Sequence, residues 1–367
     1  MKFSRQNAVT AIAGLAALMG VAVFGVTAVR TVVCQSEAEE ILSGIDPIVS
    51  EPPQVDLEEY DRRMRRLAHL PEGVSGTGNG AVDGGESGEI QEDPLWPAKA
   101  AYPNYGAILP FRRIVAYYGN FYSTGMGVLG EYPEDVMLGM LAREVAAWEE
   151  ADPDTPVQPA IDYIAVTAQL NPGKDGKYRA RMPDSQIERA LAIADRIDGI
   201  VILEVQPGLA DLMGEIRALE KYLSLPQVNL AIDPEFVMVR SGARPGTRVG
   251  TVDAADVNAA IDYLSALVRD RGLPPKVLVV HRYTRPMVTN ATEIRPTPEV
   301  QVVMDMDGWG PPAQKRDSYA SYIYPYPVQF TGFKIFYKND TKSSGSRVWT
   351  PAEVLELVPQ PSFIQYQ

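Results

Sequence analysis

The sequence predicts an α/β fold, namely a (β/α)8 barrel of the TIM type that lacks its final helix and follows a membrane-spanning helix and a flexible linker. Three observations support this prediction. Eight short apolar runs recur along residues 100–367, helical patterns lie between many of them, and this stretch has the usual length of such a barrel. Repeated strand–helix alternation indicates a parallel sheet. Eight strands favour a closed barrel over an open, doubly wound sheet.

An uncharged apolar run at residues 8–29 predicts a membrane-spanning helix. At 1.5 Å per residue it reaches roughly 33 Å, which is enough to cross the hydrocarbon core of a bilayer. Lys2 and Arg5 precede the run, so we expect the rest of the chain to lie outside the cytoplasm. This predicts a single-pass protein of the cell membrane with an extracytoplasmic C-terminal domain. The alternative is that residues 1–34 contain a signal peptide, whose cleavage releases a secreted protein.

Residues 35–99 predict an acidic stalk and a Gly-rich linker. Much of the net charge of −13 falls here, which argues against nucleic acid as a partner. No protein partner is indicated. Apolar residues recur at helical spacing between Leu57 and Leu67, so we expect a short charged helix, solvated rather than packed against a partner. Residues 73–93 have little apolar surface to bury and predict a flexible connection.

The predicted strands of the folded domain, residues 100–367, are short runs of nearly continuous apolar character, as buried parallel strands are. These runs are residues 113–121, 160–169, 198–207, 227–236, 276–284, 300–309, 331–340 and 361–367. The helical segments between them have recognisable ends. One begins at Pro133, a second has Asp184 or Ser185 as its N-cap, and a third ends at Gly272. No helix follows the eighth run in the sequence.

Gly125, Gly127 and Gly130 form a Gly-x-Gly-x-x-Gly pattern after the first strand. A dinucleotide site needs the first glycine at the strand end and the helix N-terminus within the motif. Here the helix is expected only from Pro133, and the second strand ends in Gln169 with no acid for a ribose hydroxyl. The pattern therefore predicts a loop over the barrel mouth, and no cofactor is expected.

Acidic residues gather where the predicted strands end, which is where barrels of this kind carry their working residues. The candidate catalytic residues are Glu204, Asp233, Glu235, Asp305 and Asp307. Strand alternation predicts that Asp233 and Glu235 point the same way, and likewise Asp305 with Asp307 and Glu204 with Gln206. Crowded carboxyls have separated pKa values. One protonated and one ionised carboxyl is the arrangement that glycosidic acid–base chemistry requires. Alternatively, individual acids cap helices or pair with Arg and Lys.

Further polar and aromatic residues at the same strand ends are candidates for substrate binding. They are Tyr117, Gln169, Gln206, His281, Trp309 and Lys334. Trp309 opens a long aromatic segment, residues 308–330, after the sixth strand. Rings beside a cleft stack on sugars, and a segment of this length usually has a function. Alternatively, the rings pack the segment onto the barrel. His281 is either a hydrogen-bonding wall residue or a base.

Three of these segments resemble a known family. "RIVAYYGNF" (113–121), "AIDPEF" (231–236) and "VVMDMDGWG" (302–310) resemble the first, fourth and sixth strands of chitinase-type glycoside hydrolase barrels. The resemblance implies that Glu235 is the general acid and Asp233 its supporting neighbour. It places Asp305 or Asp307 where the family assists the substrate.

The chain also departs from the chitinase-type pattern. Val228 and Ala231 stand where that family has two further acids, the third strand lacks Ser-x-Gly-Gly, and the last strand lacks a tryptophan. Lysozyme-type barrels also use Asp-x-Glu, so this motif does not choose between the two families.

Other chemistries have less support. A single cysteine excludes an intramolecular disulfide, and two histidines leave little for a zinc site. Neither a Gly-x-Ser-x-Gly elbow nor a Gly-Lys-Ser/Thr phosphate loop is present. A divalent cation held by carboxylates stays open. The sequence thus predicts a glycoside hydrolase acting on a cell-envelope or extracellular glycan. The alternative is a non-catalytic glycan-binding or structural surface protein.

Overall fold

The computed structural model describes residues 53–71, 94–344 and 346–367. From Gln54 onward these residues belong to one compact unit. The predicted membrane span at residues 8–29 and the predicted linker at residues 73–93 lie outside the described residues. No helix within the described ranges combines the length and the apolar character that crossing a bilayer requires.

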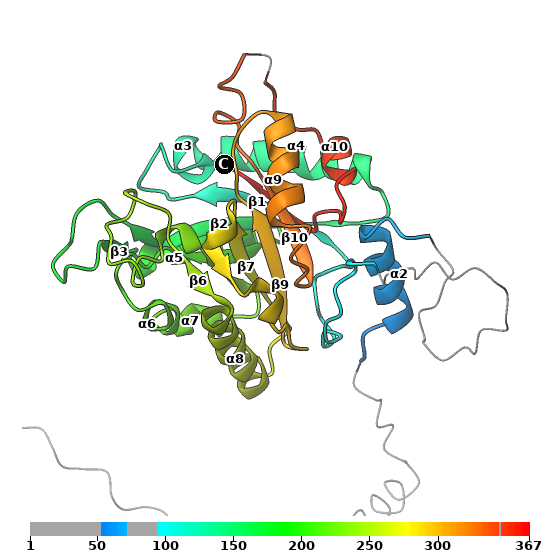
Figure 1. The fold of residues 1–367 in the computed structure, drawn as a ribbon, viewed down its shortest axis with the longest axis horizontal. Helices are drawn as coiled ribbons and strands as arrows, with labels where there is room; N and C mark the ends of the chain where they lie inside the picture. Colours follow the sequence, from blue (N-terminus) through cyan, green and yellow to red (C-terminus); the bar gives the residue numbers. More distant parts are fainter. Residues whose placement is uncertain (1–52, 72–93, 345) are drawn as a thin grey trace, which may run out of the picture. The chain divides into compact units, whose positions relative to one another are not determined.

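Eight parallel strands close into a barrel within the described residues, because β1 pairs with both β2 and β11. The strands are β1 (Arg113–Gly119), β2 (Val157–Ala168), β4 (Ile200–Val205), β5 (Val228–Ile232), β7 (Lys276–Arg282), β9 (Val300–Met306), β10 (Phe330–Ile335) and β11 (Phe363–Tyr366). Figure 1 shows them at the centre, with helices around them. The short β3 (Arg179–Arg181) adds antiparallel to β2. The prediction of a closed (β/α)8 barrel is confirmed.

Helices connect most successive strands. They are α3 (Val128–Glu131), α4 (Glu134–Ala151), α5 (Asp184–Asp195), α6 (Leu212–Arg217), α7 (Glu220–Leu223), α8 (Ala254–Arg271), α9 (Pro312–Tyr322) and α10 (Pro351–Leu355). The 3-10 turns are η1 (Pro234–Phe236), η2 (Arg285–Met287) and η3 (Ala291–Glu293), and β6 (Val252–Asp253) pairs with β8 (Val288–Thr289).

The ends of the helices follow local sequence signals. α8 begins with a capping box between Asp253 and Asp256 and ends at Gly272, whose φ of 62° suits glycine. α5 differs slightly from the prediction, because Pro183 takes the N-cap position and Asp184 becomes the first helical residue.

Strand alternation divides the barrel side chains into two sets. Outward residues such as Val115 and Leu203 belong to the shell between strands and helices. Inward residues differ along the strands. Near the strand N-termini most of them are apolar, with buried Asn229 and Gln301 as polar exceptions. The apolar residues include Ile114, Ala116, Ala160, Ile202, Ala231, Val279, Val303, Phe330 and Phe363. Near the strand C-termini the inward residues are polar, and this end holds the candidate site.

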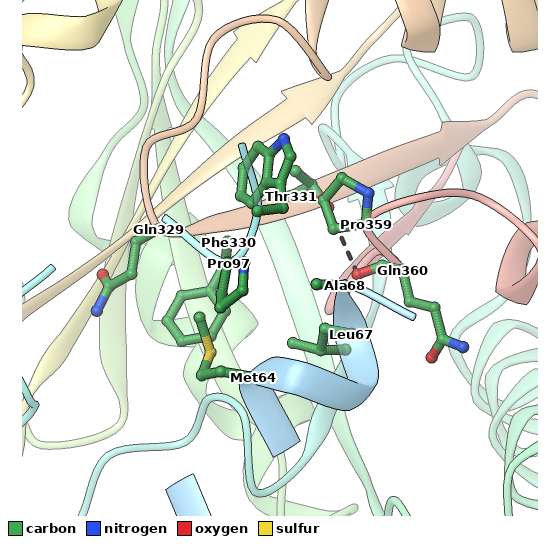
Figure 2. Close-up of a pocket in the computed structure, with 10 residues that line it drawn as sticks. Met64, Leu67, Ala68, Pro97, Gln329, Phe330, Thr331, Pro359 and Gln360 are labelled. Atoms are coloured by element: carbon green, nitrogen blue, oxygen red, sulfur yellow. Dashed lines mark hydrogen bonds between the residues drawn. The ribbon is translucent and has the colours of Figure 1, made fainter. Parts of the chain in front are cut away.

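Helix α2 (Leu57–Leu67) packs against the N-terminal end of the barrel. Tyr60 and Met64, each 5% exposed, belong to the same apolar cluster as Phe330 and Phe363. Figure 2 shows Met64 beside Phe330 around a small cavity. The backbone N–H of Gln360 donates to the carbonyl oxygen of Leu67 at 2.7 Å. The predicted helix is present, but it is docked rather than solvated, because the apolar stripe of this charged helix meets an apolar barrel end.

Candidate active site

A cavity of about 670 Å³ opens at the C-terminal ends of the barrel strands. Its lining combines acids, amides and aromatic rings, and it includes Tyr118, Met126, Gln206, Asp233, Glu235, Phe236, Tyr283, Asp307, Trp309, Gln314, Tyr322, Lys334 and Phe336. Cavities that bind small molecules have volumes of about 300–1,000 Å³. Six sequence candidates line this cavity: Gln206, Asp233, Glu235, Asp307, Trp309 and Lys334.

The glycine-rich loop forms part of this lining through Gly125 and Met126. A Cβ on Gly127, at φ 129°, would lie 2.4 Å from the carbonyl oxygen of Tyr118, and one on Gly130 would lie 2.3 Å from that of Asn120. The glycines therefore let the loop pack directly onto the end of β1. This placement agrees with the predicted loop at the mouth. A one-turn helix already begins at Val128, earlier than the predicted start at Pro133.

His281 lies buried at the bottom of the site between two carboxyl groups. Its Nε2 is 3.0 Å from Glu204 Oε2, and its Nδ1 is 3.1 Å from Asp305 Oδ2. Burial alone would lower the pKa of His281, but the hydrogen bonds to these acids outweigh it and raise that pKa well above the usual value. Burial raises the pKa of Glu204, but the charge and hydrogen bond of His281 outweigh burial, so the net shift is downward.

Lys334 is the second buried cation of the site. Its Nζ lies 3.1 Å from Asp307 Oδ1 and 3.8 Å from the ring centre of Tyr118. Tyr118 in turn donates its hydroxyl to Glu204 Oε1 at 2.9 Å. Burial would lower the pKa of Lys334, but Asp307 and Glu204 outweigh it and raise that pKa. An amine held as ammonium is a poor nucleophile, which argues against Schiff-base chemistry at this lysine.

Asp233 and Glu235 come together by a turn rather than by strand alternation. β5 ends at Ile232, and Pro234 begins the 3-10 turn η1. Asp233 Oδ1 accepts a hydrogen bond from the backbone N–H of Glu235 at 2.9 Å. The predicted alternation of these two residues is therefore wrong, although both line the cavity.

These two acids differ in their access to the cavity. Asp233 is 3% exposed, whereas Glu235 is half-buried. Burial and then the charge of Glu204 raise the pKa of Asp233 well above its usual value. Burial and then the charge of Asp307 raise the pKa of Glu235. Glu235 is thus an acid that keeps its proton to higher pH and that a ligand in the cavity can reach.

The other predicted inward pairs are found together. Gln206 Nε2 donates to Glu204 Oε1 at 2.7 Å. Asp305 and Asp307 both face Nδ1 of His281, at 3.1 and 3.6 Å. Glu204, His281 and Asp305 do not line the cavity themselves but lie fully buried beneath it.

The aromatic segment at residues 308–330 combines the two expected roles. Trp309, 53% exposed, and Tyr322 line the cavity. Tyr319 instead packs onto the barrel, where its hydroxyl donates to the carbonyl oxygen of Pro359 at 2.6 Å. Much of the segment is helix α9 rather than loop.

Two candidates are placed away from the cavity. Tyr117 points outward from β1, where its hydroxyl lies 2.9 Å from that of Tyr337. The adjacent Tyr118 faces the cavity instead. Gln169 lies beyond the end of β2, half-buried, and its backbone N–H donates to the carbonyl oxygen of Tyr178.

Asp162 is a buried acid that the sequence analysis missed. It lies within β2, and its Oδ2 accepts a hydrogen bond from Gln365 Nε2 at 2.6 Å. Burial, then the charge of Glu204, raises its pKa well above the usual value. A lone acid inside the apolar run "AIDYIAV" is the signal that could have revealed it.

The described residues contain no group of three or more His, Cys, Asp or Glu side chains arranged to hold a metal ion. The ionised acids at the bottom of the site face His281 and Lys334 instead. The arrangement can donate a proton from Glu235 and present the carboxylate of Asp307.

No protein-family model matches the sequence, and no curated protein matches it. Among solved structures, the chain is similar to the Bacillus subtilis mannanase BCman at 10% identity and a TM-score of 0.37, over 71% of this chain and 81% of that one. It is also similar to a xyloglucan-specific endo-beta-1,4-glucanase from a metagenomic library, at 10% identity and a TM-score of 0.37, over 71% and 88%. Bacillus subtilis mannanase man26 follows at 11% identity and a TM-score of 0.35, over 70% and 79%. The chain thus has a weak resemblance in fold to these glycoside hydrolase barrels.

Proposed function

We propose that the cavity binds a glycan and hydrolyses a glycosidic bond. The observation that carries this proposal is the pairing of two unlike carboxyls in one cavity. Glu235 has a pKa raised by burial and by the charge of Asp307, while Asp307 is held by Lys334 at 3.1 Å. A protonated carboxyl beside a carboxylate is the minimal apparatus for cleaving an acetal between two sugars.

Glu235 is the general acid, which donates its proton to the leaving glycosidic oxygen. Such proton transfer contributes about 10²–10⁴-fold to a rate. Asp307 is the nucleophile, or the base that activates water. Asp233 is a positioning residue, because its side chain accepts the backbone N–H of Glu235 and so fixes the turn that carries the acid.

The mouth of the cavity suits a sugar ring. Trp309, Tyr322 and Phe236 present flat apolar faces, and Gln206 and Gln314 present amide groups. Sugars combine apolar faces with hydroxyl edges, so such a lining offers both kinds of contact.

The location of the protein is part of the proposal. The apolar run at residues 8–29, with Lys2 and Arg5 before it, supports a membrane anchor with the barrel on the extracytoplasmic side. The substrate is then a glycan of the cell envelope or of the extracellular space. A secreted form after signal cleavage is the alternative.

A second function is favoured by a different observation. Three acids of the site, Glu204, Asp305 and Asp307, all lie within 4 Å of His281. Such a network can equally be a structural part of the barrel interior that takes no part in a reaction. In that case the protein binds glycan, or acts as a surface component, without turnover.

The test compares three forms of the full chain: native, Glu235→Gln, and Glu150→Gln. Glu150 is exposed on α4, so the last form is a control with the same chemical change. Each is incubated with a panel of envelope and extracellular polysaccharides, and new reducing ends are measured. We expect release by the native and Glu150→Gln forms and at least 100-fold less by Glu235→Gln. Binding without release by all three would favour the non-catalytic alternative.

A further inference from the structure

His281 has an unusual position for one of only two histidines in the chain. Its side chain is fully buried, and both ring nitrogens face carboxyl oxygens, from Glu204 at 3.0 Å and from Asp305 at 3.1 Å. A third carboxyl, that of Asp307, lies 3.6 Å from Nδ1. The other histidine, His69, is exposed.

Acids from several sides of the barrel act on His281. They are Asp162 of β2, Glu204 of β4, Asp233 after β5, and Asp305 and Asp307 at the end of β9. Tyr118 of β1 contacts Glu204, and Lys334 of β10 lies 3.1 Å from Oδ1 of Asp307. Asp307 thus lies between Lys334 and His281, one beside each oxygen.

The number of hydrogen-bond donors on the ring limits the protonation states that this imidazole can have. A neutral ring has one N–H donor and one lone-pair acceptor. Both nitrogens face carboxyl oxygens. If the ring were neutral and both acids were ionised, the lone pair of one nitrogen would face a carboxylate oxygen, so that two acceptors would meet without a proton between them. Three arrangements avoid this conflict. Either the ring is an imidazolium with two N–H donors, or it is neutral and the proton is carried by Asp305 or by Glu204.

We propose that His281 is an imidazolium that acts as a positioning residue, clamped between Glu204 and Asp305 and holding the Oδ2 side of the Asp307 carboxylate for the reaction in the cavity. The role in the reaction rests on the proposed glycan hydrolysis, whereas the charge state does not. Two positive charges, Lys334 at 3.1 Å from Oδ1 and the ring of His281 at 3.6 Å from Oδ2, attract the two oxygens of Asp307 and so favour one direction of its carboxylate. The electrostatic balance agrees, because the acids around the ring raise the pKa of His281 well above its usual value against the effect of burial.

The charge state is tested on the native full chain in detergent, labelled with ring-¹⁵N histidine. Two histidines give two sets of ring signals, and the exposed His69 serves as the internal reference. We expect the ring of His281 to show two protonated nitrogens from pH 5 to 8. A neutral ring for His281, or loss of one of its ring protons within this range, would overturn the proposal. In the Asp305→Asn variant we expect the titration of His281 to move to lower pH, because the charged ring loses the carboxylate that accepts its Nδ1 proton.

The positioning role is tested through the pH dependence of cleavage. His281→Gln keeps hydrogen-bonding capacity but removes the charge. We expect kcat to fall at least tenfold with little change in KM, and the pH profile of kcat to shift. An unchanged kcat and pH profile, in a folded variant, would overturn the role. If the native protein shows the imidazolium but cleaves no glycan, the proposed function fails and the positioning role is overturned with it, while the assigned charge state stands.

Discussion

The two ends of the barrel interior are built on the same eight strands and the same inward positions, yet their chemistry is opposite. At the N-terminal end most inward side chains are apolar, and α2 adds Tyr60 and Met64 to them. At the C-terminal end the inward positions carry acids, His281 and Lys334. The difference indicates that one end contributes stability through apolar burial, while the other holds buried charges that cost stability and that we propose for catalysis.

The largest effect is expected from removing a charge at the polar end. Lys334→Met leaves the carboxylate of Asp307 without its partner at 3.1 Å. Removing one member of a buried ion pair destabilises a protein by about 3–5 kcal/mol. We expect that loss in denaturant unfolding, together with at least 100-fold slower glycan cleavage. An equally stable and active variant would show that the pair has neither role.

The apolar end should respond in stability alone. Met64→Ala removes a buried side chain from the contact between α2 and the barrel. Truncating a buried Met to Ala costs about 2–5 kcal/mol. We expect a fall of that size in the free energy of unfolding, with kcat unchanged under conditions where the protein is folded. Arg62→Ala, on the exposed side of α2, is the control and should change stability by less than about 1 kcal/mol. A lower kcat in folded Met64→Ala would show that the apolar end also affects the reaction, which contradicts the expectation.

The two ends should also differ in their response to pH. The pKa values of Asp162, Asp233 and His281 are raised, so the folded state holds these protons more tightly than the unfolded state. Their stabilisation is complete below the unfolded pKa values and is lost as pH rises through the folded ones. Glu204, with a lowered pKa, has the opposite sign.

We therefore expect the free energy of unfolding to fall between pH 5 and 8, by up to about 1.4 kcal/mol per pH unit for each proton that only the folded state retains. The upper limit of this window avoids Lys276, at the apolar end, whose pKa is lowered by burial to about 8 and whose effect has the opposite sign. Equilibrium denaturation at four pH values measures the slope. A rise in stability across this window would mean that the buried acids are ionised in the folded protein.

The smallest expected effect is at the rim of the polar end. Trp309 is about half exposed and lines the cavity, so Trp309→Ala removes little buried surface. We expect stability to change by less than about 0.5 kcal/mol and KM for a cleaved glycan to rise several-fold. An unchanged KM would place the sugar away from this ring.

Much of the barrel follows from sequence periodicity, because alternating strands and helices permit few topologies. Side-chain direction is harder to predict. Tyr117 was expected in the cavity, but Tyr118 lies there, since a shift of one residue moves a strand side chain to the other face. Asp162 lies within β2 and not at a strand end, so the rule that barrels carry working residues at strand ends does not point to it. Glu235 reaches the cavity through the turn that Pro234 begins, which alternation does not describe.

The docking of α2 could not be predicted from local sequence. The spacing of its apolar residues indicates an amphipathic helix, and the helix is present. Its partner is the apolar ring made by residues such as Phe330 and Phe363, which are far apart in the chain. Only the closed barrel brings that ring together.

The most direct test of this account measures cleavage and unfolding on the same preparations of native, Glu235→Gln and Met64→Ala full chains. We expect the two variants to have opposite effects on activity and on stability. Glu235→Gln should lose at least 100-fold in reducing-end release and keep the native unfolding free energy, while Met64→Ala should lose stability and keep kcat. Full cleavage by Glu235→Gln would contradict the assignment of the general acid, and with it the division of the barrel into a stabilising end and a reactive end.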